Sequence, residues 1–229
     1  MIKKYKNFIF GTSEMTDGGM RLDGDLSAVN RQRYFDKISL NRIPIVSAGL
    51  TNSNVVKLVD NKDKNSVIRG ADALITNENN LILSITTADC LPIYFFEPST
   101  RITSIAHAGW RGLLDGIISN TIRTMKEKYE AKTEEIKIFI GPHINKCHFA
   151  VKDDVYNLFK DYPTARFDKG EKKYIDLGLV AISQAVKAGV MKNNIEISKE
   201  CTYCLGEKYF SFRRDGVLKT MINFIVYKK

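Results

Sequence analysis

Three consecutive apolar segments in the middle of the chain limit the possible folds most strongly. They read ADALIT, LILSITTADCLPIYFF and RITSIAHAGWRG, and they lie between residues 71 and 112. A strand that is apolar on both sides is buried on both faces, so these segments predict a central sheet that is covered on each side. Each segment also contains or ends in polar residues. We expect these at the rim of the sheet, where binding sites are usually built.

Further runs rich in β-branched and aromatic residues extend the pattern along the chain. Strands are predicted at Lys6–Phe10, Ile43–Ala48, Asn54–Val59, Ala73–Thr76, Leu81–Thr86, Leu91–Phe96, Ile102–His107, Ile136–Ile140, Ile195–Ser198, Tyr209–Arg213 and Thr220–Tyr227. Helical periodicity predicts helices at Ala28–Ser39, Leu113–Tyr129, Asp153–Lys160 and Leu177–Ala188. Because strands outnumber helices without regular alternation, we predict an α/β (α+β) fold, with a mixed β-sheet core and flanking helices.

The length of 229 residues predicts a single domain that spans residues 1–229. The sequence contains neither a G-x-G-x-x-G nor a Walker motif, and it has no apolar stretch of 18 residues. The apolar run near the N-terminus is too short for a signal peptide. We therefore expect a cytoplasmic protein without a membrane partner.

The net charge of +9 raises the question of nucleic-acid binding. The lysines are scattered and mixed with acidic residues, as in DNKDKNS and KEKYEAK. This pattern favours a solvated surface over a nucleic-acid interface. A mildly positive field also suits an anionic small substrate such as phosphate.

The four cysteines are expected to be reduced thiols. Cys201 and Cys204 form a C-x-x-C pair, but a structural zinc site usually needs a second pair of ligands, and the sequence shows none. We interpret the two as small residues at a strand end, with redox pairing as the alternative.

Asp89 and Cys90 directly precede Leu91-Pro92, where the proline is expected to interrupt strand pairing and expose the thiol. His107 ends the next predicted strand. If the two strands are neighbours, Cys90 and His107 can bind zinc together. Alternatively, they form a pair of nucleophile and base, or Cys90 is inert core packing.

Other polar residues follow the remaining strands. Arg111 lies at a predicted helix start and could bind an anion, while Trp110 is either a stacking surface or a packing anchor. Arg213 and Arg214 suggest a second anion contact, although at least one of them is expected to be structural. The segment GPHINKCHFAV adds His143 and His148 near the sheet rim.

Several segments in order, TADCLPI, AHAGWRGL, a GP turn, CTY and YFSFRRDG, resemble the multicopper polyphenol oxidoreductase (laccase-domain) family. The resemblance covers almost the whole chain. It implies a purine nucleoside phosphorylase, which cleaves adenosine, inosine, guanosine or methylthioadenosine with phosphate to base and ribose 1-phosphate. It also implies adenosine deaminase activity at a metal held by a His–Cys–His set.

The resemblance assigns Cys90 and His107 as metal ligands and, with Asp89, as catalytic residues; it is compatible with Arg111, Arg213 and Arg214 as phosphate or substrate contacts. Zinc is the expected metal, since copper centres need more than three histidines.

The chain departs from the family pattern at the first ligand. This His lies in a QVHG-type segment, which reads GLTNSNVVKLV here, so Thr51 stands in its place. His143 or His148 is a possible substitute ligand. Ala150 replaces an acidic residue, and SEMTDGGM lacks the family's arginine before the glycine pair. These departures leave two alternatives to the enzyme: a metal-free binding protein, and a Cys90/His107 thiol hydrolase, including editing of a peptidoglycan precursor.

Overall fold

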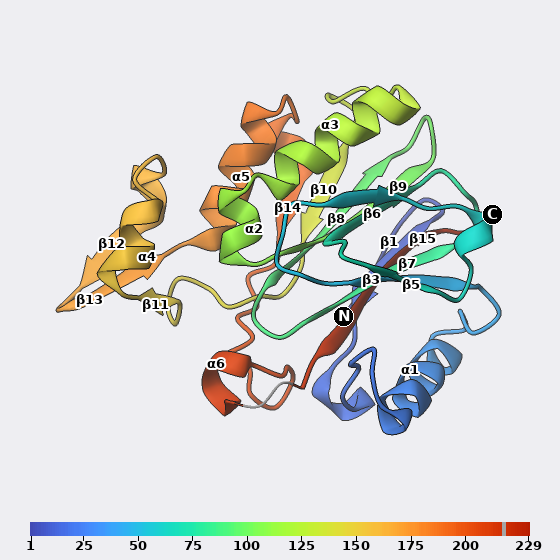
Figure 1. The fold of residues 1–229 in the computed structure, drawn as a ribbon, viewed down its shortest axis with the longest axis horizontal. Helices are drawn as coiled ribbons and strands as arrows, with labels where there is room; N and C mark the ends of the chain where they lie inside the picture. Colours follow the sequence, from blue (N-terminus) through green and yellow to red (C-terminus); the bar gives the residue numbers. More distant parts are fainter. Residues whose placement is uncertain (217–218) are drawn as a thin grey trace.

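Two six-stranded sheets form the centre of the computed structural model, which describes residues 1–216 and 219–229 (Figure 1). The first sheet has the order β1–β2–β15–β7–β3–β5. Its strands are β1 (Ile2–Tyr5), β2 (Phe8–Thr12), β15 (Met221–Tyr227), β7 (Ile82–Thr87), β3 (Ile45–Gly49) and β5 (Val67–Arg69). Only the β3–β5 and β3–β7 pairings are parallel in this part of the described chain. The sheet is therefore mixed.

The second sheet has the order β14–β10–β8–β9–β6–β4. Its strands are β14 (Ile195–Ile197), β10 (Lys137–Ile140), β8 (Leu91–Glu97), β9 (Ile102–Ala108), β6 (Ala73–Thr76) and β4 (Val56–Leu58). The pairs β10–β14 and β4–β6 are parallel and the others antiparallel. This sheet holds β6, β8 and β9, while β7 belongs to the first sheet, so the three apolar segments are shared between both sheets.

The two sheets face each other and helices cover their outer faces (Figure 1). Phe10 and Leu83 of the first sheet pack with Tyr94 and Ile105 of the second in one buried cluster. The helices are α1 (Asp25–Lys37), α2 (Trp110–Leu114), α3 (Ile117–Tyr129), α4 (Asp153–Leu158), α5 (Leu177–Lys187) and α6 (Phe212–Asp215). Helix α1 covers the first sheet, and α3 and α5 cover the second. The predicted mixed core with flanking helices is confirmed.

A small third sheet, β11–β13–β12, lies at one end of the molecule with α4 (Figure 1). Its strands are β11 (Ala150–Val151), β12 (Arg166–Lys169) and β13 (Lys172–Ile175). The sequence analysis missed this sheet and β5, because short, half-exposed strands lack a run of apolar residues. Short 3₁₀ helices at Met15–Asp17, Asn61–Asp63, Pro163–Ala165 and Lys192–Asn194 complete the elements.

Two predicted elements are wrong. The predicted strand Tyr209–Arg213 instead leads into α6, whose first turn is capped by the Ser211 hydroxyl, which accepts a hydrogen bond from the Arg214 amide at 3.2 Å. Alternation of aromatic and polar residues had suggested a strand, but the local side-chain cap favours a helix start. The predicted helix Leu113–Tyr129 is divided into α2 and α3 at Gly116, which has a φ of 82°.

Among the described helices, none combines the length and hydrophobicity that crossing a bilayer requires.

A buried polar cluster joins the two sheets. The Tyr94 hydroxyl lies 2.9 Å from Thr12 Oγ1, 3.0 Å from the Gly11 carbonyl oxygen and 3.2 Å from Asn223 Oδ1. The Asn223 amide also donates to Thr87 Oγ1 at 2.9 Å. Since buried polar groups are costly when unpaired, this cluster fixes the position of one sheet on the other.

We expect Tyr94→Phe to lower the free energy of unfolding by about 1–3 kcal/mol, because buried partners of the hydroxyl lose a hydrogen bond. Urea denaturation followed by circular dichroism measures this loss. The control is Tyr5→Phe on the edge strand β1, where the side chain is only half-buried and the change should be within about 0.5 kcal/mol. Equal losses in both variants would contradict a special role for the cluster.

Candidate functional site

Antiparallel pairing of β8 and β9 brings Cys90 and His107 together at one end of the second sheet. In this register Leu91 pairs with Ala108 and Pro92 with His107, so Cys90 lies opposite Gly109. The two strands are neighbours, as the sequence analysis required. The strand break lies at Asp89, which has a φ of 86°, whereas Pro92 is accommodated inside β8.

The Asp72 carboxylate contacts the Nδ1 side of the His107 imidazole. His107 is 5% exposed, and its Nδ1 lies 2.9 Å from Oδ1 of the fully buried Asp72. Because Nδ1 is engaged by a carboxylate, Nε2 is the ring nitrogen left for Cys90 or a metal. A carboxylate that orients a histidine in this way is a common feature of zinc sites and of nucleophile–histidine pairs.

The Asp72 carboxylate also organises the loop after β3. It accepts hydrogen bonds from the amides of Thr51, Asn52 and Ser53 at 2.8–3.1 Å, and from the hydroxyls of Thr51 and Ser53 at 3.0 and 2.8 Å. These donors and His107 together lower the pKa of Asp72 despite its burial. One buried charge therefore fixes both the imidazole and the adjacent loop.

His107 is held in its charged form by its neighbours. Burial disfavours the imidazolium, but the contacts of His107 with Cys90 and Asp72 outweigh burial and raise the pKa of His107 to about 9. A metal ion on these two side chains would replace the proton that His107 carries.

Asn52 is the third side chain at this point. A Cβ atom added to Gly109 would lie 3.1 Å from Asn52 Oδ1, 3.3 Å from Cys90 Sγ and 3.7 Å from His107 Cε1. Gly109 therefore leaves open a small space around which the three side chains gather. A thiolate and an imidazole are strong zinc ligands and an amide oxygen is a weak one, so the donor set fits a zinc ion with two strong ligands.

Thr51 lies beside this space without facing it. Its hydroxyl is directed to Asp72 and to Ser53, at 3.0 and 3.1 Å. Asn52 has a φ of 58°, a conformation that glycine adopts most readily. The sequence analysis placed Thr51 at the position of the family's first histidine, but it is the Asn52 side chain that lies near Cys90 and His107.

A cavity of about 820 Å³ opens beside Cys90 and His107. Arg21, Arg69 and Arg111 line it, together with Trp110. Arg21 is paired with Asp23 at 2.7 Å, whereas no described carboxylate pairs with Arg69 or Arg111. The Arg111 guanidinium lies 4.1 Å over the Trp110 ring. This cavity is large enough for a small molecule and carries positive charge for an anion.

A second hollow of about 440 Å³ reaches Cys90 from the other side. Phe149, Phe212 and Trp110 line it, with Lys152 and Arg213. Cys90 and Trp110 line both hollows. The thiol therefore lies where an arginine-lined cavity meets a hollow with aromatic walls.

Asp89 connects α6 to the strand that carries Cys90. Its buried carboxylate accepts hydrogen bonds from the Thr202 hydroxyl at 2.6 Å, the Ser211 hydroxyl at 3.0 Å and the Arg213 amide at 2.7 Å. These contacts hold the turn before Cys90 in place; the catalytic role that the sequence analysis assigned to Asp89 stays a prediction. The Arg213 side chain donates to the Ala150 carbonyl oxygen at 2.8 Å and still lines the aromatic hollow.

Arg214 is structural. Its guanidinium donates to three backbone carbonyls, those of Thr202, Tyr203 and Tyr209, and pairs with Asp215 at 2.7 Å. The sequence analysis expected such a role for at least one of the two arginines.

The candidate substitute ligands lie away from Cys90. His143 is buried, and its Nδ1 lies 2.8 Å from the Gly141 carbonyl oxygen. His148 stacks on the Tyr203 ring at 4.0 Å, with its Nδ1 3.2 Å from Cys147 Sγ. Neither histidine lines a hollow that contains Cys90.

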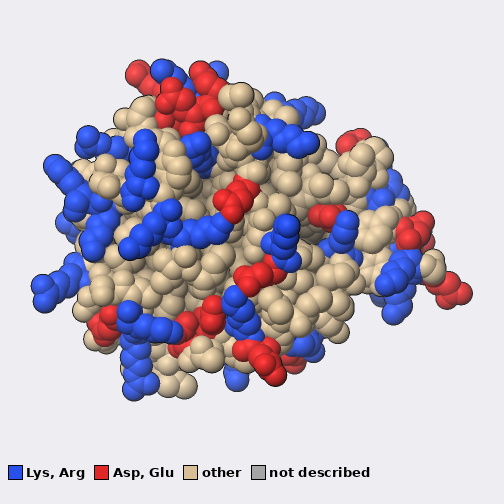
Figure 2. Space-filling view, turned by 180° about the vertical axis from the view of Figure 1, so that it is seen from behind, with Lys and Arg blue, Asp and Glu red and all other residues tan. Residues whose placement is uncertain are grey.

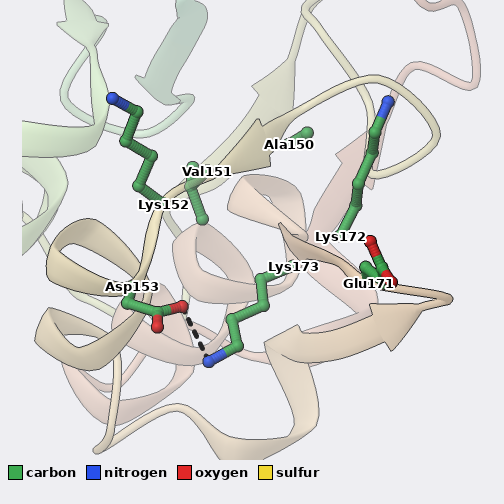
Figure 3. A pocket seen from close by; sticks show the side chains of 7 residues that line it. All are labelled: Ala150, Val151, Lys152, Asp153, Glu171, Lys172 and Lys173. Atoms are coloured by element: carbon green, nitrogen blue, oxygen red, sulfur yellow. Dashed lines mark ion pairs between the residues drawn. The ribbon is translucent and has the colours of Figure 1, made fainter.

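Charged side chains of both signs cover the surface outside the site. In Figure 2, Lys and Arg lie interspersed with Asp and Glu over the whole face. A groove of about 630 Å³ on the small sheet is lined by Lys152, Lys172 and Glu171, while Lys173 pairs with Asp153 at 2.8 Å (Figure 3). Its open, lysine-rich wall contains no nucleophile or histidine.

Comparison with known proteins shows which family the chain belongs to. The model of the multi-copper polyphenol oxidoreductase laccase family matches residues 18–228. The chain belongs to this family. Among its structural relatives, the hypothetical protein YfiH of Bacillus licheniformis has a TM-score of 0.92 at 27% identity, with 98% of this chain and 94% of that chain covered. YlmD of Geobacillus stearothermophilus superposes equally well, with a TM-score of 0.92 at 27% identity over 98% and 93% of the two chains.

Curated relatives carry enzyme names. The chain is 33% identical to a purine nucleoside phosphorylase of Bacteroides thetaiotaomicron over 162 residues, 68% of this chain and 60% of that protein. It is 32% identical to a purine nucleoside phosphorylase of Clostridium acetobutylicum over 176 residues, 75% of this chain and 73% of that one. The adenosine deaminase RL5 of an unknown prokaryote is 30% identical over 182 residues, 76% and 68% of the two chains. These relatives are thus named as enzymes of the purine nucleoside phosphorylase or adenosine deaminase type, and the chain spans about 60% of the first of them.

Sequence reasoning missed four residues of this laccase-family site: Asp72, Asn52, Arg21 and Arg69. Asp72 directly precedes a buried strand, which is the signal that could have identified it. Asn52 follows Thr51 at a position where the family motif has glycine. The two arginines had no such signal, because strand β5 and the loop around residue 21 approach Cys90 only in the tertiary structure.

The charged state of His107 predicts a pH-dependent stability in chelator-treated protein. The folded pKa of about 9 exceeds the ordinary value of 6.5, so His107 stabilises the fold fully below pH 6.5, and this contribution disappears as pH rises through 9. The contribution of His107 to the free energy of unfolding is on the order of 3 kcal/mol. Urea unfolding of wild type and His107→Gln from pH 6 to pH 9.5 measures it. We expect the gap between the two proteins to close with rising pH; parallel curves would contradict the coupling.

Proposed function

We propose that the chain is a purine nucleoside phosphorylase that also deaminates adenosine. The observation that carries the proposal is the position of Cys90 and His107, backed by Asp72, at the junction of an arginine-lined cavity and an aromatic hollow. Adenosine, inosine, guanosine and methylthioadenosine combine a planar base with a ribose, and phosphorolysis needs an anion beside them. The two hollows supply both kinds of surface.

Phosphate is proposed to bind on the side of Arg69 and Arg111. Both guanidinium groups line the cavity without a described carboxylate partner, whereas Arg21 at the same cavity is paired with Asp23. Guanidinium groups bind phosphate oxygens through charge-assisted hydrogen bonds. The base is proposed to stack in the hollow formed by Phe149 and Phe212, with Trp110 shared between the two sites.

The proposed resident metal is zinc, held by Cys90 and His107. When bound, zinc lowers the pKa of water and polarises substrate oxygens, which is the chemistry deamination requires. Asp72 fixes the His107 ring so that Nε2 faces Cys90, and Asp89 holds the strand turn that presents the thiol. The Asn52 amide supplies only a weak third donor, so we expect weaker zinc binding than a His–Cys–His set provides.

The phosphate site is tested by replacing its arginines. We expect Arg69→Ala and Arg111→Ala each to raise KM for phosphate by roughly tenfold, because each variant loses a charge-assisted contact. Release of free base from inosine at varied phosphate concentration gives these constants. Arg123→Ala, an exposed arginine on α3, is the matched control and should behave as wild type. Wild-type protein that releases no base from any of the four nucleosides would refute the proposed activity.

The zinc site is tested by restoring the family motif. We expect the double variant Thr51→His/Asn52→Gly to bind zinc about 100-fold more tightly, because it adds an imidazole and removes the amide that fills the site. Competition with a zinc indicator measures affinity, and adenosine deamination should rise in parallel. Thr51→His and Asn52→Gly alone serve as controls with smaller gains. Unchanged affinity in the double variant would contradict this assignment of Thr51 and Asn52.

A metal-free thiol hydrolase is the second candidate, favoured by one specific observation. Asp72, His107 and Cys90 have the order of contacts of a carboxylate–histidine–thiol triad. In this reaction the proton of Cys90 would pass to His107 and Cys90 would attack an acyl carbon. His107 would then give that proton to the leaving amine or alcohol, and water would hydrolyse the acyl thioester. Activity that survives a strong chelator but disappears in Cys90→Ser supports this candidate and excludes the zinc enzyme.

A further inference from the structure

Four side chains from two distant segments meet outside the Cys90 site. Cys147 and His148 follow β10, and Cys201 and Cys204 follow β14. Their ligand atoms all lie within 4.8 Å of one another. The C-x-x-C pair, which the sequence left without partners, therefore has a second pair of ligands in the folded chain. The earlier interpretation of Cys201 and Cys204 as small strand-end residues is incomplete for this reason.

The measured distances match the edges of a tetrahedral zinc site. Cys147 Sγ lies 3.7 Å from Cys201 Sγ and 3.6 Å from Cys204 Sγ. His148 Nδ1 lies 3.2 Å from Cys147 Sγ and 3.3 Å from Cys204 Sγ. Zinc bonds of about 2.3 Å to sulfur and about 2.0 Å to nitrogen separate two sulfurs by about 3.8 Å and sulfur from nitrogen by about 3.5 Å.

The backbone around the cluster holds these side chains in place. Residues 145–149 form a turn in which the amides of His148 and Phe149 donate to the Asn145 carbonyl oxygen. A second turn closes when the Leu205 amide donates to the Cys201 carbonyl oxygen at 3.0 Å. The Thr202 amide joins the two turns by donating to the His143 carbonyl oxygen at 3.0 Å. Both turns therefore present their ligands toward the same point.

Contacts beyond the four ligands also suit a metal site. The Asn145 amide donates to Cys201 Sγ at 3.4 Å, a contact that stabilises a thiolate. The His148 ring stacks on Tyr203 at 4.0 Å and 16°, which fixes the direction of its Nδ1. Cys201 is buried, while Cys147 and Cys204 are exposed, so an ion can enter from solvent.

We propose that Cys147, His148, Cys201 and Cys204 bind a structural zinc ion. Three thiolates and one imidazole form a closed set of four protein ligands, which is typical of structural zinc and leaves no position for substrate. This site is independent of the proposed activity at Cys90, and its role is to fasten the segment after β10 to the segment after β14.

The proposed ion would stabilise a wall of the Cys90 site from outside. Thr202, inside the C-x-x-C pair, donates to Asp89 at 2.6 Å, and Arg213 donates to the Ala150 carbonyl oxygen close to His148. Both segments fastened by the ion therefore contact the residues around the aromatic hollow. Metal binding that ties two loops together contributes directly to folding stability.

The test separates this site from the catalytic one by using Cys90→Ser/His107→Ala as the parent protein. We expect this variant to purify with one zinc per chain, and Co²⁺ in place of zinc to give the visible bands of tetrahedral thiolate coordination. Adding Cys204→Ser to the parent should abolish both signals. The matched control is the parent protein with His143→Gln in place of Cys204→Ser, and its metal content should be unchanged.

X-ray absorption of the zinc-loaded parent protein provides a measurement that does not depend on a further variant. We expect three sulfur ligands and one nitrogen ligand around the metal. The proposal is overturned if the parent protein binds no zinc or cobalt, if fewer than three sulfurs are found, or if mass spectrometry of the freshly purified chain shows a disulfide among these cysteines. If the wild-type protein releases no base but the parent variant still binds zinc or cobalt, only the proposed activity is refuted.

Discussion

The buried carboxylate of Asp72 is the interaction on which the rest of the site depends. It lies at the start of β6, is fully buried, and accepts hydrogen bonds from three successive amides of the loop after β3. The same group holds Nδ1 of His107 on β9. A charge in this position is tolerated only because so many donors surround it. Its neighbours are thereby fixed, and the reactive nitrogen of His107 is directed to Cys90.

A second carboxylate has a corresponding role on the other side of the thiol. Asp89 binds Thr202, Ser211 and the Arg213 amide, which ties the C-terminal segment to the turn before Cys90. Two buried carboxylates therefore hold the structure around Cys90: Asp72 fixes the imidazole, and Asp89 fixes the turn before the thiol.

The two Cys/His groups of the chain differ in a physically meaningful way. The Cys90 site combines two strong donors with one amide and opens into cavities, which suits reversible exchange of metal, water or substrate. The group around Cys201 has four donors within 4.8 Å of one another, and its residues line neither of the hollows at Cys90. A ligand set with an open position allows a metal to bind water or substrate, whereas a closed set of four protein ligands stabilises the fold.

The sequence by itself determined the parts of this protein that depend on local pattern. Apolar runs predicted β6, β8 and β9 with accurate bounds, and the register of two adjacent strands sufficed to bring Cys90 near His107. Short local motifs spread along the chain also identified the family. Tyr209–Arg213 was misread, because alternation alone does not reveal the Ser211 cap.

Only the tertiary structure decided which distant residues meet. Arg69 on a short edge strand, Asn52 in a left-handed turn and Asp72 at a strand start have no shared periodicity, and they converge because the loops after β3 and before β6 meet at one sheet end. In the same way, Cys147 and Cys201 are separated by 54 positions in the chain yet lie in contact. Such pairings follow from sheet order, here the parallel pairing of β10 with β14, which no local sequence pattern specifies.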